Sequence, residues 1–272
     1  MVSISHLFVY PIKGCSGLAV DAWPLEYTGL RHDRQWMLID EYGRFISQRE
    51  VAALALCRIG LHPEGWHIRF DTMHQTILLP REWRSTASIE VQVWDDRVTA
   101  MLGRLEWDAF FSEALGRKVQ LVFFSPDSSR RVDTRFAPLP HYTFFSDGYP
   151  LLTLGSASLD HLNQKLTEPI GWDRFRPNIV VQTEIPHTED SWSHLVHNDY
   201  RLQLVKPCAR CVVTTIDQKN GQRGKEPLLT LSRYRQRENK IYFGVNTLVE
   251  TAISKPWIRV GDELEPISNE GF

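Results

Sequence analysis

Two cysteines separated by two residues, Cys208 and Cys211, carry the most reactive side chains of this sequence. Pro207 precedes them and Arg210 stands between them. Nearby cations favour the thiolate over the thiol, and the thiolate is the form that attacks an electrophile or binds a metal. Because proline cannot donate a strand hydrogen bond, we expect a bend at the cysteines and a new strand over residues 212–216.

The spacing of the two cysteines is compatible with several kinds of site. A structural zinc site normally has four ligands, but the remaining cysteines, Cys15 and Cys57, lie far apart in the sequence. A thioredoxin-like redox pair normally opens a helix, whereas here we expect a strand. A third interpretation is one thiolate that holds a soft transition metal, and the ordinary one is two buried cysteines that pack as small apolar side chains. The spacing alone leaves these alternatives open, including a zinc site with histidine ligands.

Four other places combine cations or polar side chains with backbone suited to an anion. Lys13 and Arg34 stand at the ends of expected strands, and Ser156 opens an expected helix. Arg176 and Asn178 flank a proline that stiffens their loop. Cations and a helix N terminus are the usual means of holding a phosphate. Each also has an ordinary interpretation: a solvated Lys13, an Arg34 paired with a neighbouring aspartate, and a Ser156 that only caps its helix.

The first half of the chain predicts mainly short strands. Paired strands are expected for 36–39 with 44–47, turning near Gly43, for 66–70 with 76–79, and for 88–94 with 98–100. The remaining expected elements of this half are a strand at 2–9, a helix at 107–115 that stops at Gly116, and a strand at 121–124. Several short strands at this spacing predict a sheet or a barrel.

The second half mixes strands with helices. We expect helices at 158–166 and 226–234, and strands at 150–154, 179–182, 240–244, 247–249 and 257–260. A polar, proline-bearing stretch after residue 124 predicts the boundary between two domains, at residues 1–122 and 123–272.

Composition excludes several functional classes. A net charge of −2 in 272 residues gives no basis for binding nucleic acid. Four cysteines do not make a disulfide framework, and no apolar run is long enough to span a membrane. The first residues lack the basic and apolar regions of a signal peptide, so we expect a cytoplasmic protein.

Seven short motifs stand in order along nearly the whole chain. They are Tyr-Pro-Ile-Lys-Gly at 10–14, Gly-Leu-Arg-His-Asp-Arg-Gln-Trp at 29–36, Ser-Gln-Arg-Glu at 47–50, Asp-Gly-Tyr-Pro-Leu-Leu at 147–152, Arg-Phe-Arg-Pro-Asn at 174–178, Lys-Pro-Cys-Ala-Arg-Cys at 206–211 and Arg-Val-Gly-Asp at 259–262. Together they resemble the MOSC family, the molybdenum cofactor sulfurase C-terminal domain, with its β-rich N-terminal domain. The similarity is to the amidoxime-reducing component family and its bacterial homologues. It implies a mostly β fold with α/β elements, in which a β-rich N-terminal domain packs on a β-barrel MOSC domain with peripheral helices.

The resemblance implies a molybdenum cofactor (Mo-molybdopterin) in a cleft between the domains. It makes Cys211 the protein ligand of the molybdenum and the catalytic cysteine, with Cys208 as a structural neighbour. Asp217 is a candidate proton donor, although a solvated turn carboxylate is its ordinary interpretation. The residues expected to bind the cofactor are Lys13, Gly14 and Arg34 from the N-terminal domain, and Ser156, Arg176, Asn178, Ala209, Arg210 and Asn246 from the MOSC domain.

The implied activity is reduction of small N-hydroxylated compounds, such as hydroxylamines, amidoximes and N-hydroxylated bases. Some bacterial relatives continue into a ferredoxin-like domain, and this chain ends at Phe272 without such a cysteine cluster. We therefore expect electrons from a separate flavin, haem or iron–sulfur protein. The alternative is a carrier that delivers the molybdenum cofactor, or a sulfur atom on Cys211, to another protein.

Overall fold

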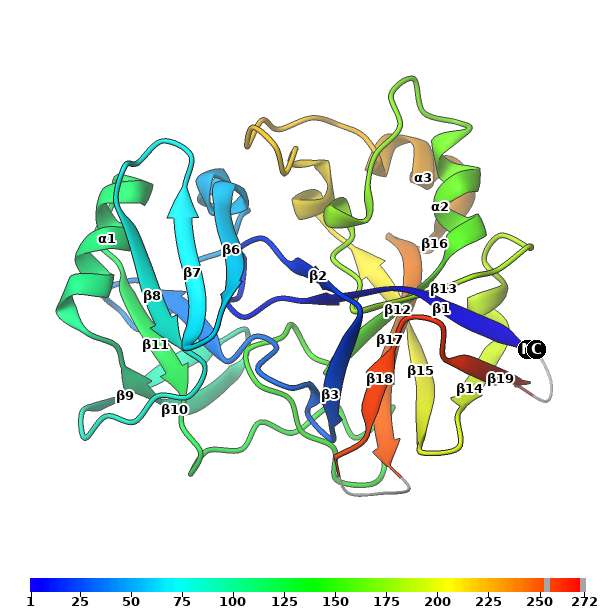
Figure 1. The fold of residues 1–272 in the computed structure, drawn as a ribbon. Helices are drawn as coiled ribbons and strands as arrows, with labels where there is room; N and C mark the ends of the chain where they lie inside the picture. The colour runs from blue at the N-terminus through cyan, green and yellow to red at the C-terminus, as the bar shows by residue number, and fades with distance from the viewer. Residues whose placement is uncertain (252–254, 270–272) are drawn as a thin grey trace.

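The structure is a computed structural model that describes residues 1–251 and 255–269. Two β-rich parts lie side by side (Figure 1): one built from residues between β5 (Trp36–Ile39) and β11 (Gln120–Phe124), and a barrel that includes most of the second half of the chain. Residues 125–150 connect them without a regular strand. The mostly β class expected from the sequence is confirmed.

The barrel closes because its last strand pairs with its first. Seven strands follow one another around it, and Leu151 of the first strand pairs with Thr247 of the last. The strand at the N terminus is one of the seven, so the barrel needs both ends of the described chain. The order is β12 (Leu151–Gly155), β13 (Ile179–Val181), β1 (Val2–Val9), β19 (Glu263–Ser268), β14 (Trp192–Val196), β15 (Tyr200–Arg210) and β17 (Lys240–Thr251).

The N-terminal part packs two small sheets and one helix around tryptophans. Trp36 is fully buried, with its ring centre 5.6 Å from that of Trp107 and 4.8 Å from that of Phe123. Such edge-to-face contacts add to the free energy that burial of the rings provides. The elements are β5 (Trp36–Ile39), β11 (Gln120–Phe124), β10 (Asp96–Leu102) and β9 (Ser88–Val93) in one sheet, β6 (Cys57–His62), β7 (Gly65–Phe70) and β8 (Thr76–Pro80) in the other, and α1 (Leu105–Leu115).

Smaller elements join or flank these two parts. Strand β2 pairs with β1, and β3 and β4 form a sheet with β18 near the C-terminal end. Helices α2 and α3 cover one side of the barrel (Figure 1). The bounds are β2 (Leu18–Val20), β3 (Ala22–Glu26), β4 (Gly29–Leu30), β16 (Gln236–Arg237), β18 (Trp257–Arg259), α2 (Ser156–Asn163), α3 (Leu228–Arg235), and the short helices η1 (Ala52–Leu56), η2 (Trp172–Arg174), η3 (Thr188–Ser191) and η4 (Val212–Thr215).

The new strand expected after the cysteines, over residues 212–216, is wrong, and the proline does not end the strand before them. Strand β15 continues through Pro207 to Arg210, and residues 212–215 form the short helix η4. Pairing with β17 shifts register on both sides of Pro207, so bulges absorb the proline. Gly244 lies opposite the second shift at φ +78°, where a Cβ would meet Leu154 at 2.7 Å. These bulges turn the cysteine end of β15.

Most other expectations agree with the structure. The strand at 2–9, the pairings 66–70 with 76–79 and 88–94 with 98–100, and the helix at 107–115 are confirmed. The expected hairpin partner at 44–47 forms only isolated bridges, through Arg44 and Phe45. The strands expected at 240–244 and 247–249 are one strand, β17. Helices α2 and α3 are displaced by about one turn or less from the expected ranges. The predicted domain boundary at residue 122 stays a prediction.

Gly65 offers a test of the packing between β7 and β8. A Cβ at this position would meet the Leu79 carbonyl oxygen at 2.0 Å, whereas one at Gly60 in the adjoining strand meets nothing nearer than 3.9 Å. We expect Gly65→Ala to lower the free energy of unfolding by about 1–3 kcal/mol, because the strands must move apart. Urea denaturation measures this, and Gly60→Ala is the matched control. Equal stability of the two variants would contradict this packing.

Candidate functional site

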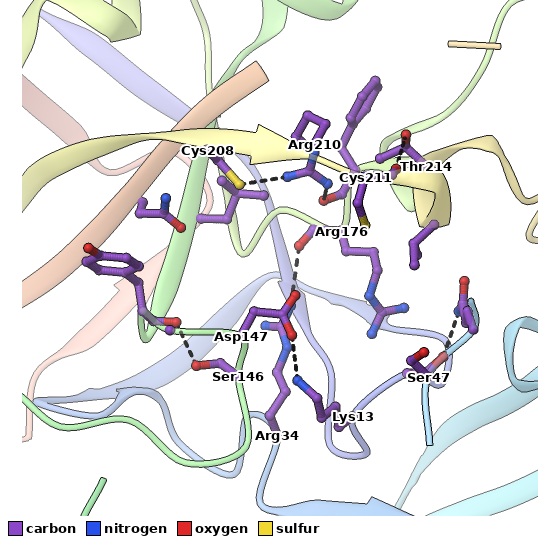
Figure 2. A pocket seen from close by; sticks show the side chains of 18 of the residues that line it. Lys13, Arg34, Ser47, Ser146, Asp147, Arg176, Cys208, Arg210, Cys211 and Thr214 are labelled. Carbon is purple, nitrogen blue, oxygen red and sulfur yellow. Dashed lines mark hydrogen bonds and ion pairs between the residues drawn. The ribbon is translucent and has the colours of Figure 1, made fainter. Parts of the chain in front are cut away.

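A cleft of about 980 Å³, including its open mouth, lies between the two parts of the molecule. Five cationic side chains and one carboxylate line it. Figure 2 shows the labelled side chains converging on it from opposite sides, with the two cysteines on one wall and Lys13 and Arg34 on the other. The charged residues are Lys13, Arg34, Arg49, Asp147, Arg176 and Arg210. The cleft therefore carries an excess of positive charge and also contains thiols.

The cysteine wall is formed where β15 ends. Cys211 is half-buried and precedes η4, and its carbonyl oxygen accepts bonds from Thr214 N (3.1 Å) and Thr214 Oγ1 (2.9 Å). These bonds fix the backbone that carries the thiol. Its Sγ accepts a bond from Arg49 Nη2 at 3.4 Å. The Sγ of Cys208 accepts one from Arg210 Nη1 at 3.1 Å. The two thiols thus have different cationic neighbours.

Lys13 is a buried cation on the opposite wall. Its side chain is 8% exposed, and its Nζ lies 2.6 Å from Asp147 Oδ1 and 4.9 Å from the centre of the Phe45 ring. Burial lowers the pKa of Lys13, and the charge of Asp147 acts in the opposite direction. The Asp147 side chain is 76% exposed, so solvent screens this pair and it compensates the buried charge only in part.

Asp147 is the carboxylate of the cleft. Desolvation raises its pKa, but the charge and hydrogen bond of Lys13 outweigh this effect, assisted by a bond from Trp94 Nε1 at 3.2 Å. The pKa of Asp147 is consequently below its usual range, and the group is ionised at neutral pH. Its loop is held by buried Arg130, which donates to the carbonyl oxygens of Ser146 and Asp147.

Two guanidinium groups stack on the same aromatic ring. The centre of the Tyr10 ring lies 4.2 Å from Arg34 and 4.4 Å from Arg176. Arg34 also bonds to the buried carboxylate of Asp33, and Arg176 donates to the Cys15 carbonyl oxygen at 2.6 Å. Desolvation, followed by the charge of Arg34, lowers the pKa of Arg176. Because these effects oppose the charged form, a bound anion would relieve them.

Asn178 links this cation pair to the barrel. It is 1% exposed, and its Oδ1 accepts bonds from Arg34 Nη1 (3.0 Å) and Leu152 N (3.3 Å). Its Nδ2 donates to the Phe8 carbonyl oxygen and to Asp33 Oδ1, both at 3.1 Å. With these bonds made, Asn178 acts on the cleft by orienting Arg34.

The structure brings most of the expected site residues together. Nine line the cleft: Lys13, Gly14, Arg34, Arg176, Asn178, Ala209, Arg210, Cys211 and Asn246. Asn246 donates from Nδ2 to the Lys206 carbonyl oxygen at 3.1 Å. Their roles toward a cofactor remain predictions.

Ser156 and Asp217 are not in the lining of this cleft. Ser156 begins α2, and its hydroxyl exchanges hydrogen bonds with the backbone of Thr183. The buried carboxylate of Glu189 lies at the same helix end, where it accepts bonds from Ser158 Oγ at 2.7 and 2.9 Å. The side chain of Glu189 therefore occupies the helix end at which a phosphate was expected. The Oδ1 of Asp217 accepts a bond from Lys219 N in a turn.

Several lining residues were not among the expected ones, and three of these have charged or aromatic side chains that contact the expected site residues or each other: Arg49, Trp94 and Asp147. Arg49 and Asp147 fall inside motifs that support the family resemblance, and their place in these motifs is the sequence signal that could have identified them as site residues. Trp94 lies at the turn between β9 and β10 with φ +57°, and a sequence pattern gives no sign of that.

The cleft fits a cofactor that brings a metal with most of its ligands. Within residues 1–251 and 255–269, no group of three or more His, Cys, Asp or Glu side chains is arranged to hold a metal ion. A single thiolate suits a metal whose other ligands come from the cofactor. The cations fit its phosphate, and the buried Nε of Arg210 has no hydrogen-bond partner in the described part of the chain.

Comparison with known proteins agrees with this chemistry. The family model described as MOSC domain matches residues 140–265, and the one described as MOSC N-terminal beta barrel domain matches residues 1–118. The chain is 31% identical to mitochondrial amidoxime-reducing component 1 of Homo sapiens, over 96% of this chain and 81% of that protein. It is 30% identical to mitochondrial amidoxime reducing component 2 of Bos taurus, over 96% and 82%.

A second group of relatives is much longer. The chain is 30% identical to the molybdenum cofactor sulfurase of Oryza sativa subsp. japonica, over 97% of this chain but 35% of that protein. It thus spans about a third of the length of these relatives. No helix among the described residues is long and apolar enough to cross a bilayer.

Replacing Lys13 tests whether this buried cation binds an anion. Lys13 lines the cleft, and its side chain is 8% exposed. We expect Lys13→Met to weaken binding of inorganic phosphate, measured by calorimetry, by about tenfold, the loss of one charged hydrogen bond. Because the substitution also removes the ion pair with Asp147, circular dichroism checks that the variant is folded. Unchanged phosphate affinity of the folded variant would contradict this interpretation of Lys13.

Proposed function

This chain belongs to the family of MOSC domain proteins that carry the MOSC N-terminal beta barrel domain, and on this premise we propose that it is a molybdenum-cofactor-dependent reductase of N-hydroxylated compounds. The observation that carries the proposal is the half-buried thiol of Cys211 in a cleft with five cations and one carboxylate. A thiolate holds molybdenum there, and the cations hold the phosphate of its cofactor.

The residues of the cleft divide these tasks. Cys211 supplies the sulfur ligand, and the two bonds that Thr214 donates to the Cys211 carbonyl oxygen keep it facing the cleft. Lys13, Arg34 and Arg176 hold the phosphate, since all three line the cleft and desolvation works against the charges of Lys13 and Arg176. When bound, the molybdenum cofactor supplies the two-electron redox chemistry, and the protein supplies binding, orientation and local charge.

The reaction consumes electrons and protons from outside the cleft. A hydroxylamine takes up two electrons and two protons, its N–O bond breaks, and an amine and water leave. Asp147 is ionised at neutral pH, so it accepts hydrogen bonds and has no proton to donate. Asp217 lies outside the cleft lining. We therefore assign the protons to water entering through the mouth and the electrons to a separate redox protein.

One observation favours a second candidate function. Cys211 is a free cysteine that is reachable from the cleft, and this chain matches a third of the length of molybdenum cofactor sulfurases. A reachable thiol also suits a carrier that hands on the cofactor, or a sulfur atom bound to Cys211.

The two cysteines should differ in their effect on metal content. We expect Cys211→Ser, purified from a host that makes the cofactor, to lose nearly all molybdenum, because the sulfur ligand is gone. Cys208→Ser is the control, since its thiol bonds to Arg210. Elemental analysis measures both. Equal molybdenum in the two variants would show that Cys211 is not the ligand.

Turnover separates the reductase from the carrier. We expect the molybdenum-loaded protein to reduce hydroxylamine or benzamidoxime when a reduced viologen dye supplies electrons, and Cys211→Ser to show no turnover. Loss of N–OH compound and appearance of the amine or amidine are followed by chromatography. Loaded protein that never turns over, but gives its molybdenum to a cofactor-free acceptor enzyme, would favour the carrier.

A further inference from the structure

Arg49 reaches the sulfur of Cys211 from the other part of the molecule. The two residues are 162 positions apart, and Arg49 Nη2 donates to Cys211 Sγ at 3.4 Å. Cys211 follows a barrel strand, whereas Arg49 precedes η1 in the N-terminal part. Both side chains line the cleft.

The position of the Arg49 side chain is fixed at several points. Its guanidinium lies 4.4 Å from the centre of the Trp94 ring, and Trp94 is in turn bonded to Asp147. Its backbone oxygen accepts a bond from Arg223 Nη2 at 2.6 Å. The neighbouring Gln48 donates to the Gly14 carbonyl oxygen at 2.6 Å and exchanges bonds with Gln218. Stacking and backbone bonds together preorganise the donor, so little side-chain entropy is lost in the contact.

Arg49 differs from the other cations of the cleft in what it contacts. Lys13 pairs with Asp147, while Arg34 and Arg176 stack on Tyr10. Arg210 donates to the sulfur of Cys208. Among the described residues, Arg49 is the side chain that donates a hydrogen bond to the Cys211 sulfur.

We propose that Arg49 is a positioning residue for the molybdenum centre, acting through the sulfur of Cys211. This inference rests on the proposed function. The bond holds the sulfur toward the cleft and draws electron density from it. Groups that bond to a metal ligand orient that ligand and tune the metal, and hydrogen bonds to ligand sulfur raise a reduction potential. The positive charge of Arg49 acts in the same direction, because reduction adds negative charge.

The test compares Arg49→Met with the wild type, both loaded with molybdenum. We expect Arg49→Met to lose molybdenum about tenfold faster on dialysis, in line with the loss of a group that supports a metal ligand. We also expect a lower midpoint potential in a redox titration. Arg49→Lys keeps the charge and should recover part of both properties.

Arg44→Met is the matched control. Arg44 lies on the same segment but pairs with Asp40 and stacks on Tyr42, outside the cleft lining. It should match the wild type in retention and potential, and circular dichroism checks that every variant is folded. If Arg49→Met does not fold, Arg49→Lys against Arg44→Lys makes the same comparison.

The outcomes separate this inference from the proposed function. A wild-type protein that retains no molybdenum refutes the proposed function and the inference with it. A loaded wild type whose retention and potential are unchanged in Arg49→Met overturns the inference alone. Faster loss of molybdenum without a change in midpoint potential also overturns the inference, because Arg49 would then only stabilise the fold around the site. If Arg44→Met also loses molybdenum faster and has a lower midpoint potential, the effect comes from removing any nearby positive charge and not from the bond to Cys211.

Discussion

The cleft depends on one buried carboxylate at the junction of the two parts. Asp33 is 3% exposed, and it accepts bonds from Arg34, from Tyr10 N at 2.8 Å and from Asn178 Nδ2 at 3.1 Å. Desolvation raises the pKa of Asp33 despite these partners, so keeping this carboxylate charged costs free energy. Removing one member of such a buried pair typically costs about 3–5 kcal/mol, although the intact pair adds little stability. Asp33 therefore contributes chiefly by fixing the orientation of the Arg34 side chain.

The barrel brings these groups together because their segments meet at one of its ends. Strand β1 leads into Tyr10 and Lys13, and β13, which pairs with it antiparallel, begins after Arg176 and Asn178. Strand β15 ends at the same opening, beside the bulged stretch of β17 that contains Asn246. The N-terminal part then closes the cleft from outside. A closed sheet holds these strand ends in fixed register, and a site built on it is more rigid than one built on free loops.

The sequence predicts the parts of this arrangement that depend on local pattern. Alternating apolar residues locate the paired strands, and the family resemblance locates nine of the residues that line the cleft, eight of them within its motifs. It does not predict contacts that distant residues decide. Pro207 stays within a strand because Gly244, across the sheet, permits a bulge. The helix end at Ser156 is occupied by Glu189, and Arg49 reaches Cys211 across 162 residues. No local pattern contains these pairings, since each follows from register and packing.

The charge of the cleft lining is opposite in sign to the net charge of the whole protein. The protein has a net charge of −2, yet the cleft gathers five cations and a single carboxylate, and burial works against the charge of two of the cations, Lys13 and Arg176. A folded protein accepts such an arrangement when a ligand compensates it, because preorganised charges need no rearrangement on binding. The exposed carboxylate of Asp147 pairs with Lys13 and is the one negative side chain among the charged residues of the cleft lining, so most of the compensating charge must come from a ligand. The anionic cofactor of the proposed function is a ligand of this kind.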